Sequence, residues 1–97
     1  MNNFEKPQVA YSEMKLKVLI TDIEKKLDKN QNDYWIIRTR LDKETRRDYL
    51  AFKNDFNLAP KALQLLENYP HQLVNSWVVL TIKKKNDREK VIAIEEL

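Results

Sequence analysis

Glycine is absent from all 97 residues of the chain. A chain of this length would average about seven glycines. Because glycine adopts positive φ at the least cost, any left-handed turn must use another residue, and asparagine and aspartate tolerate that region best. Four asparagines lie where turns are expected, at Asn30, Asn32, Asn54 and Asn86. The same absence excludes every glycine-rich phosphate-binding loop.

The length allows one small domain with a single core, but not two. The chain has no cysteine, which excludes disulfides, thiolate metal sites and a cysteine nucleophile, and it suits a reducing cytoplasm. Its apolar runs are only a few residues long, whereas a membrane span needs about 20. The first 14 residues lack the basic start and apolar middle of a secretory signal. We therefore expect a cytoplasmic protein with no membrane partner.

Hydrophobic periodicity predicts a mainly β domain at residues 14–97, preceded by an N-terminal arm at residues 1–13. The expected strands cover residues 14–23, 34–41, 46–53, 75–85 and 89–97, and the expected helix covers residues 58–69. Residues 20–27 are also compatible with a helix, so the end of the first strand is left open. Pro60 fits the first turn of the later helix, and Pro70 stops it. The order is β-β-β-α-β-β.

Four of the five arginines lie between Arg38 and Arg47, within the hairpin predicted at 34–53. A period of two separates the apolar set of Trp35, Ile37, Thr39 and Leu41 from the set of Tyr34, Ile36, Arg38 and Arg40. Burying two unpaired arginines would cost several kcal/mol each, so the second set is expected to face outward. In the next strand we assign Leu50 and Phe52 to the core.

The outer face of the hairpin would then carry aromatic and cationic side chains together. Its expected members are Tyr34, Ile36, Arg38, Arg40, Arg47, Tyr49 and Lys53. Bases stack on aromatic rings for roughly 1–3 kcal/mol each while cations follow the phosphates, so this face favours a single-stranded nucleic acid. The alternative is an ordinary exposed sheet, because tyrosine, isoleucine and arginine also pair well across strands.

Two further features are candidates for binding. The turn between the last two strands is basic, and its residues Lys84, Lys85 and Arg88 either contact phosphates or only keep an edge strand soluble. Trp77 opposes the apolar face of its strand, and with Phe4 and Tyr11 it is a candidate for binding a protein partner.

The sequence offers little for catalysis. The one histidine, His71, has no cysteine neighbours, so no metal site is expected. The serines Ser12 and Ser76 lack a histidine in a plausible order for a nucleophile. We therefore expect neither an enzyme nor a bound cofactor.

The stretch VLITDIEKKLDKNQNDYWIIRTRL (18–41) resembles the first two strands and connecting loop of small single-stranded-DNA-binding proteins of the oligonucleotide/oligosaccharide-binding (OB) fold. The stretch RRDYLAF (46–52) is similar to their third strand, and the order of elements over 14–97 is that of the fold. The resemblance implies a five-stranded barrel that binds through strands two and three with loops 28–33 and 84–88. Such families carry glycine in the first strand, so here the curvature must come from bulges without glycine.

The sequence thus predicts a non-catalytic protein that binds single-stranded DNA, or RNA, with little sequence preference. The resemblance also implies a role as an accessory subunit of a DNA replication enzyme, such as those on mobile elements, with a polymerase, primase or helicase as partner. The alternative function is an interaction subunit of a polymerase or primase complex that has little nucleic-acid binding of its own. A small Sm- or SH3-like barrel would change the fold but not the non-catalytic prediction.

Overall fold

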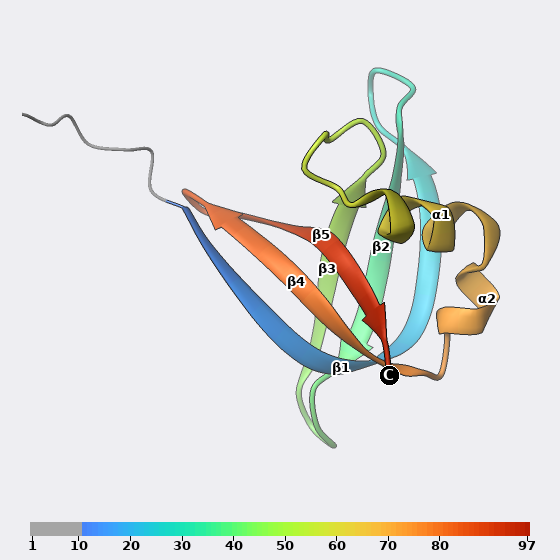
Figure 1. Ribbon diagram of the computed structural model, residues 1–97, viewed down its shortest axis with the longest axis vertical. Coiled ribbons are helices and arrows are strands. Elements are labelled where there is room, and N and C mark those ends of the chain that lie inside the picture. The colour runs from blue at the N-terminus through green and yellow to red at the C-terminus, as the bar shows by residue number, and fades with distance from the viewer. Residues whose placement is uncertain (1–10) are drawn as a thin grey trace, which may run out of the picture.

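The structure is a computed structural model and describes residues 11–97. Within this range five strands and two short helices follow one another along the chain (Figure 1). Their bounds are β1 Tyr11–Leu27, β2 Asp33–Arg40, β3 Arg46–Phe52, α1 Pro60–Asn68, α2 Pro70–Leu73, β4 Trp77–Lys85 and β5 Arg88–Glu96. The prediction of a mainly β protein with the helical segment between the third and fourth strands is confirmed.

The five strands form one antiparallel sheet in the order β3-β2-β1-β4-β5. The central strand, β1, is 17 residues long and bends sharply (Figure 1). Its first half pairs with β4 as far as Leu19, and its second half pairs with β2 from Leu19 onward. The register shifts between Ile20 and Asp22, which marks a bulge at the bend. The strand therefore curves without glycine, as the sequence required.

The curved sheet brings its two edge strands, β3 and β5, toward each other without joining them. Arg47 on β3 contacts Glu89 on β5 at 3.1 Å between Nη2 and Oε1. No hydrogen-bonded ladder links these strands within residues 11–97. The five-stranded antiparallel sheet is confirmed, but it does not close into a barrel.

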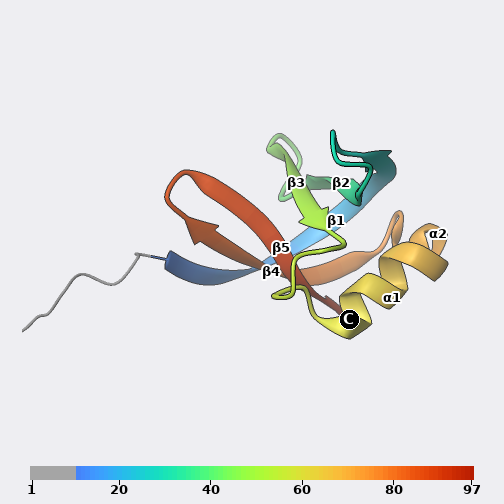
Figure 2. The ribbon, with the colours of Figure 1, turned by 90° about the horizontal axis from the view of Figure 1, so that it is seen from above.

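The hydrophobic core lies on the concave side of the sheet, and α1 packs against it through Ala62, Leu65 and Leu66. Viewed from above, both helices lie on one side, away from the tip of the β4–β5 hairpin (Figure 2). The buried apolar residues are Val18, Ile20, Trp35, Ile37, Tyr49, Ala51, Leu58, Ala62, Leu65, Leu66, Leu73, Val78, Leu80, Ile82, Val91 and Ile94. The predicted core face of β2, with Trp35 and Ile37, is confirmed.

The predicted faces of β3 were wrong. Tyr49 and Ala51 are buried, whereas Leu50 and Phe52 are only half-buried. The register pairs Tyr49 with Ile37 and Ala51 with Trp35, and residues that pair across antiparallel strands share a face. A tyrosine ring buries as much apolar area as many core residues, so residue type alone did not reveal which parity faces inward.

In β5 a second bulge changes which residues reach the core. The register shifts from Thr81 opposite Ala93 to Ile82 opposite Val91, so Ile92 is the extra residue. Val91 and Ile94 are therefore buried, whereas the strict alternation of the sequence would place Ile92 on the same face as Ile94. The carbonyl of Ile92 accepts a hydrogen bond of 2.7 Å from the backbone N–H of Ala59, which fixes the start of α1.

Several boundaries differ from the predicted ones, most of them by one or two residues. β1 begins at Tyr11, so residues 11–13 belong to the sheet rather than to an arm, and the strand continues through residues 20–27. Pro70 ends α1 but also begins the single turn of α2. Positive φ occurs at Gln31, Asn75 and Asn86, so only the last of the four expected asparagines takes this conformation.

Candidate functional site

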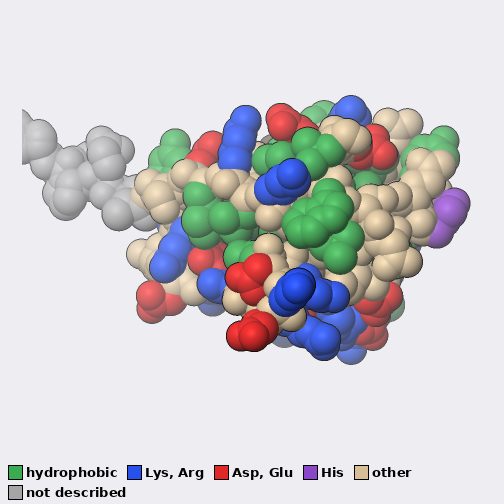
Figure 3. Space-filling view, turned by 90° about the horizontal axis from the view of Figure 1, so that it is seen from below, with side chains coloured by type: hydrophobic (Ala, Val, Ile, Leu, Met, Phe, Trp, Pro, Cys, Tyr) green, Lys and Arg blue, Asp and Glu red, His purple; other side chains and the backbone are tan. Residues whose placement is uncertain are grey.

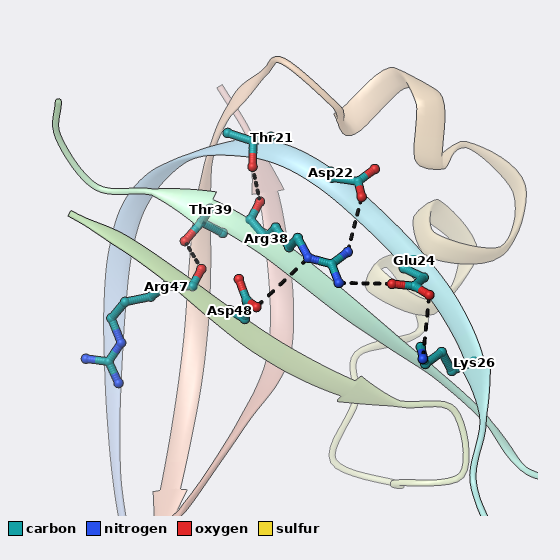
Figure 4. Close-up of polar contacts among 8 residues, drawn as sticks. All are labelled: Thr21, Asp22, Glu24, Lys26, Arg38, Thr39, Arg47 and Asp48. Carbon is teal, nitrogen blue, oxygen red and sulfur yellow. Dashed lines mark hydrogen bonds and ion pairs between the residues drawn. The ribbon is translucent and has the colours of Figure 1, made fainter. Parts of the chain in front are cut away.

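Arg38 lies at the centre of the predicted binding face, and three carboxylates surround it (Figure 4). Its guanidinium lies 3.1 Å from Asp22, 3.0 Å from Glu24 and 4.0 Å from Asp48. The hydrogen bond from Arg38 holds the pKa of Glu24 below its ordinary value, and the same contact raises the pKa of Arg38. The positive charge at the middle of this face is therefore already matched by acidic side chains.

Tyr34, Ile36 and Arg40 share the face of Arg38 on β2, but the residues expected from β3 and beyond it do not join them. Tyr49 points into the core and is 2% exposed. Arg47 is on the same side of β3, with its guanidinium 5.6 Å from the Tyr49 ring and paired with Glu89. Lys53 contacts Glu67 at 2.7 Å, and this hydrogen bond raises the pKa of Lys53. β2 and β3 therefore do not form a single exposed surface of tyrosine and arginine.

The structure instead presents an open groove of about 770 Å³ between three connecting segments. These segments are the β1–β2 loop, the β3–α1 loop and the tip of the β4–β5 hairpin, which all lie in the upper part of Figure 1. The lining residues are Asp28, Asn32, Asp33, Phe52, Asn54, Asp55, Phe56, Asn57, Lys83, Lys85, Asn86, Arg88 and Lys90. The volume is within the range of about 300–1,000 Å³ that is typical of ligand sites.

Phe56 is the most exposed large apolar residue in the described chain, at 97%. Hydrogen bonds nevertheless hold its loop in place, because the N–H of Asp55 donates to the Phe52 carbonyl and that of Leu58 donates to the Asp55 carbonyl. The Asp55 carboxylate also pairs with Lys90 of β5 at 2.9 Å. The fold thus presents an exposed aromatic ring on an anchored loop, where the ring is free to contact a ligand.

Next to Phe56 the groove has an aromatic and cationic floor. The rings of Tyr34 and Phe52 stack, with their centroids 5.5 Å apart and their planes at 23°. The Lys90 ammonium lies 5.5 Å from the centre of the Phe52 ring. Tyr34, a residue of the predicted face, therefore supports the groove through its contact with Phe52.

The cations at the tip of the β4–β5 hairpin are not paired with carboxylates. Lys85 and Arg88 have no carboxylate within ion-pair distance among residues 11–97, and neither has Lys84. The carboxylates of the groove are already engaged. Asp28 accepts two backbone hydrogen bonds from its own turn, Asp33 contacts two lysines and Asp55 pairs with Lys90. The net charge available to a ligand is positive.

The candidate partner-binding residues fall in different places. Trp77, at the start of β4, is 45% exposed. Tyr11 is 58% exposed, and the Lys83 ammonium lies 4.5 Å from the centre of its ring. Phe4 lies outside the described residues. Figure 3 shows the underside of the molecule, where hydrophobic side chains form several patches with lysine and arginine side chains between them.

Sequence reasoning missed Phe56 and misplaced Phe52. The signal for Phe56 was present, since a large aromatic residue stands alone among polar turn residues in NDFN (54–57). Such a residue cannot reach the core from a tight turn and is a candidate for binding. The signal for Phe52 was ambiguous, because only the strand register decides its face.

The described residues hold no group of three or more histidine, aspartate or glutamate side chains that could bind a metal ion. None of the helices in residues 11–97 has the length and apolar character needed to cross a membrane. The chain matches no protein-family model, no curated protein and no solved structure. Its function can therefore be inferred only from its own residues.

Proposed function

We propose that this protein binds single-stranded nucleic acid, DNA in the first place, in the groove between the β1–β2 loop, the β3–α1 loop and the β4–β5 hairpin. The observation that carries the proposal is the exposed ring of Phe56 on an anchored loop, beside the unpaired charges of Lys85 and Arg88. In an unpaired strand the bases are free to stack on aromatic rings while the phosphates meet cations. A duplex hides those base faces.

The fold supports the same proposal. A sheet in the order β3-β2-β1-β4-β5, with a bent β1 shared between β2 and β4 and a helix before β4, agrees with a partly open OB fold. In OB folds the loop after strand one and the loop between strands four and five flank the oligonucleotide site. Those two loops line the groove here.

The groove is a better candidate than the outer face of β2. A phosphate strand crossing that face would meet Asp22, Glu24 and Asp48, whose charges outnumber that of Arg38. Its approach would be opposed by repulsion. The groove offers unpaired cations instead.

The proposal is one of binding rather than catalysis. Among the described residues that line the groove there is no serine, threonine, histidine or cysteine, so nucleophiles of the Ser–His and Cys–His types are lacking there. An association with a replication enzyme stays a prediction from the OB-fold resemblance.

Fluorescence anisotropy with a labelled oligothymidylate of about 12 nucleotides, within the range of OB-fold site sizes, tests the proposal. We expect binding that prefers single-stranded over double-stranded DNA and weakens with salt. Phe56→Ala should weaken binding about 5- to 150-fold, because one stacked base contributes roughly 1–3 kcal/mol. In the double variant Lys85→Gln/Arg88→Gln, the slope of log K against log salt should fall by about 1.4.

Two matched controls lie on α1 and beside it. Lys61→Gln removes an exposed cation, and Tyr69→Ala removes an exposed aromatic ring, both away from the groove. Both should bind like the wild type. Equal affinity of Phe56→Ala and the wild type, or equal losses in the controls, would refute the groove as the site.

A further inference from the structure

A second surface lies at the opposite end of β2 from the groove. β2 runs from Asp33, in the groove, to Arg40, a distance of roughly 23 Å for eight residues. At the far end a hollow of about 260 Å³ is lined by Leu19, Arg40, Asp42, Lys43 and Trp77. The hollow and the groove share no lining residue.

Trp77 forms the apolar part of this surface. Its side chain is 45% exposed although it opens a strand whose next residue, Val78, is fully buried. Leu19 is its register partner on β1, and the Lys17 ammonium lies 5.8 Å from the centre of its ring. The indole therefore provides an apolar wall with a cation above it.

The rest of the hollow's lining is charged, and Arg40 and Lys43 outnumber the single carboxylate of Asp42. Arg40 lies directly opposite Arg46 in the β2–β3 register, and like charges in that position repel. Neither arginine, nor Lys43 between them, has a carboxylate within ion-pair distance in the part of the chain that the structure describes. The Arg40 Nε is buried and has no acceptor. A buried donor without a partner is costly, and an incoming anion would satisfy it.

The carboxylate nearest to these cations is already used by its own turn. Asp42 accepts hydrogen bonds from the backbone N–H groups of Glu44 and Thr45 and from the Thr45 hydroxyl. These bonds, first that from Glu44, hold the pKa of Asp42 below its ordinary value. Asp42 therefore shapes the turn that presents Lys43. The charge of Arg40 also lowers the pKa of Asp42, but no ion pair joins Asp42 to the arginines among residues 11–97.

We infer that this corner, made of Leu19, Arg40, Lys43, Arg46 and Trp77, binds an acidic segment of a partner protein that carries one apolar side chain. The apolar side chain would enter the hollow between Leu19 and Trp77, and flanking carboxylates would meet the arginines. Charge complementarity favours an anion, and carboxylates match the two-pronged geometry of guanidinium groups.

A nucleic acid fits this corner less well. The hollow of about 260 Å³ is below the usual range of about 300–1,000 Å³ for a small-molecule site. A strand bound in the groove would also have to cross the carboxylates of Asp22, Glu24 and Asp48 to reach it. An acidic peptide arriving from another protein need not cross that strip.

The test uses three labelled synthetic peptides built of glutamate and aspartate, with a central leucine, with alanine in its place, or with lysines replacing the acids. Anisotropy at low salt should show binding of the acidic leucine peptide, about tenfold weaker binding of the alanine peptide, and none of the basic peptide. Trp77 emission should shift to shorter wavelength on binding, whereas Trp35 is buried and reports little.

The variants Arg40→Gln/Arg46→Gln and Trp77→Ala should each weaken binding of the leucine peptide tenfold or more, while Lys61→Gln should not. Lys43→Gln, in an exposed turn, is a milder variant in case the others do not fold.

Failure of the leucine peptide to bind, or equal binding of all three peptides, would overturn the inference. It would also be overturned if the corner variants weakened oligothymidylate binding as much as Phe56→Ala does, since the corner would then belong to the nucleic-acid path. The peptide result does not depend on the groove, so the two proposals can fail separately.

Discussion

Tyr49 is the residue whose placement departs most from its expected role. The sequence suggested an outward ring for stacking bases, but the side chain is 2% exposed, and its burial raises the pKa of the phenol. Its hydroxyl is buried without a hydrogen-bond partner in the described structure. A phenol in this position contributes its ring to the core, and the hydroxyl is a cost.

Tyr49→Phe should therefore stabilise the protein. The change keeps the ring and removes the unpartnered hydroxyl, for a gain of about 1 kcal/mol. In a domain of this size, 1 kcal/mol raises Tm by roughly 4–8 °C, which thermal unfolding followed by circular dichroism can measure. A lower Tm in the variant would mean that the hydroxyl has an acceptor such as an internal water. Affinity for oligothymidylate should not change.

At the scale of elements, Arg38 joins three strands through its side chain. Asp22 and Glu24 belong to β1 and Asp48 to β3, while Arg38 itself lies on β2 (Figure 4). The Thr21 hydroxyl, at the β1 bulge, also donates to the Arg38 carbonyl at 3.2 Å. The arginine thus holds the bent part of β1 to its neighbours and is a structural rather than a DNA-binding residue in this account.

This structural role predicts how stability responds to acid. The folded pKa of Glu24 is lowered from 4.5, first by the hydrogen bond from Arg38, so its contribution is fully present above pH 4.5 and is lost as the pH falls through the lower folded pKa. Arg38→Gln should have a lower Tm than the wild type at neutral pH, and the gap should shrink below pH 4.5. Thermal melts at several pH values check this. A gap that stays constant down to pH 3 would contradict it, and Lys61→Gln is the control.

The elements also mark the limit of what the sequence could predict. Local alternation was sufficient for the number and order of strands. It also predicted the buried face of β2, because Trp35 and Ile37 have the opposite strand parity to Arg38 and Arg40. Local alternation did not predict which residues of β3 and β5 face the core. The face of Tyr49 depends on the register with β2, and the burial of Val91 depends on the bulge opposite β4. Register and bulges are set by contacts between strands that are distant in sequence.

At the scale of the whole molecule, the groove arises only because the sheet curves. The bulge in β1 bends the central strand, and the bend allows loops 28–33, 53–59 and 84–88 to border one hollow. The sequence named the first and last of these loops through the OB-fold resemblance. It missed the middle one, with Phe56, because no local pattern places the β3–α1 loop beside the hairpin tip.

The unpaired positive charges are unevenly distributed over the molecule. Arg38 of β2, Arg47 of β3 and Lys53 are matched by carboxylates. Among the described residues the cations of the hairpin tip and of the Trp77 corner, including Arg40 of β2 and Arg46 of β3, form no ion pair. A modest net charge of +3 is therefore concentrated at two ends of the fold. We propose that one end binds a nucleic acid and the other an acidic protein segment.

The most direct test of the central claim is a titration of the ¹⁵N-labelled protein with unlabelled oligothymidylate, followed by amide chemical shifts. We predict that the largest shifts occur in loops 28–33 and 53–59 and in the hairpin at residues 83–90. The amides around Arg38 and around Trp77 should change little. Shifts centred on the outer face of β2 or on the Trp77 corner, or no shifts at concentrations where anisotropy shows binding, would contradict the account.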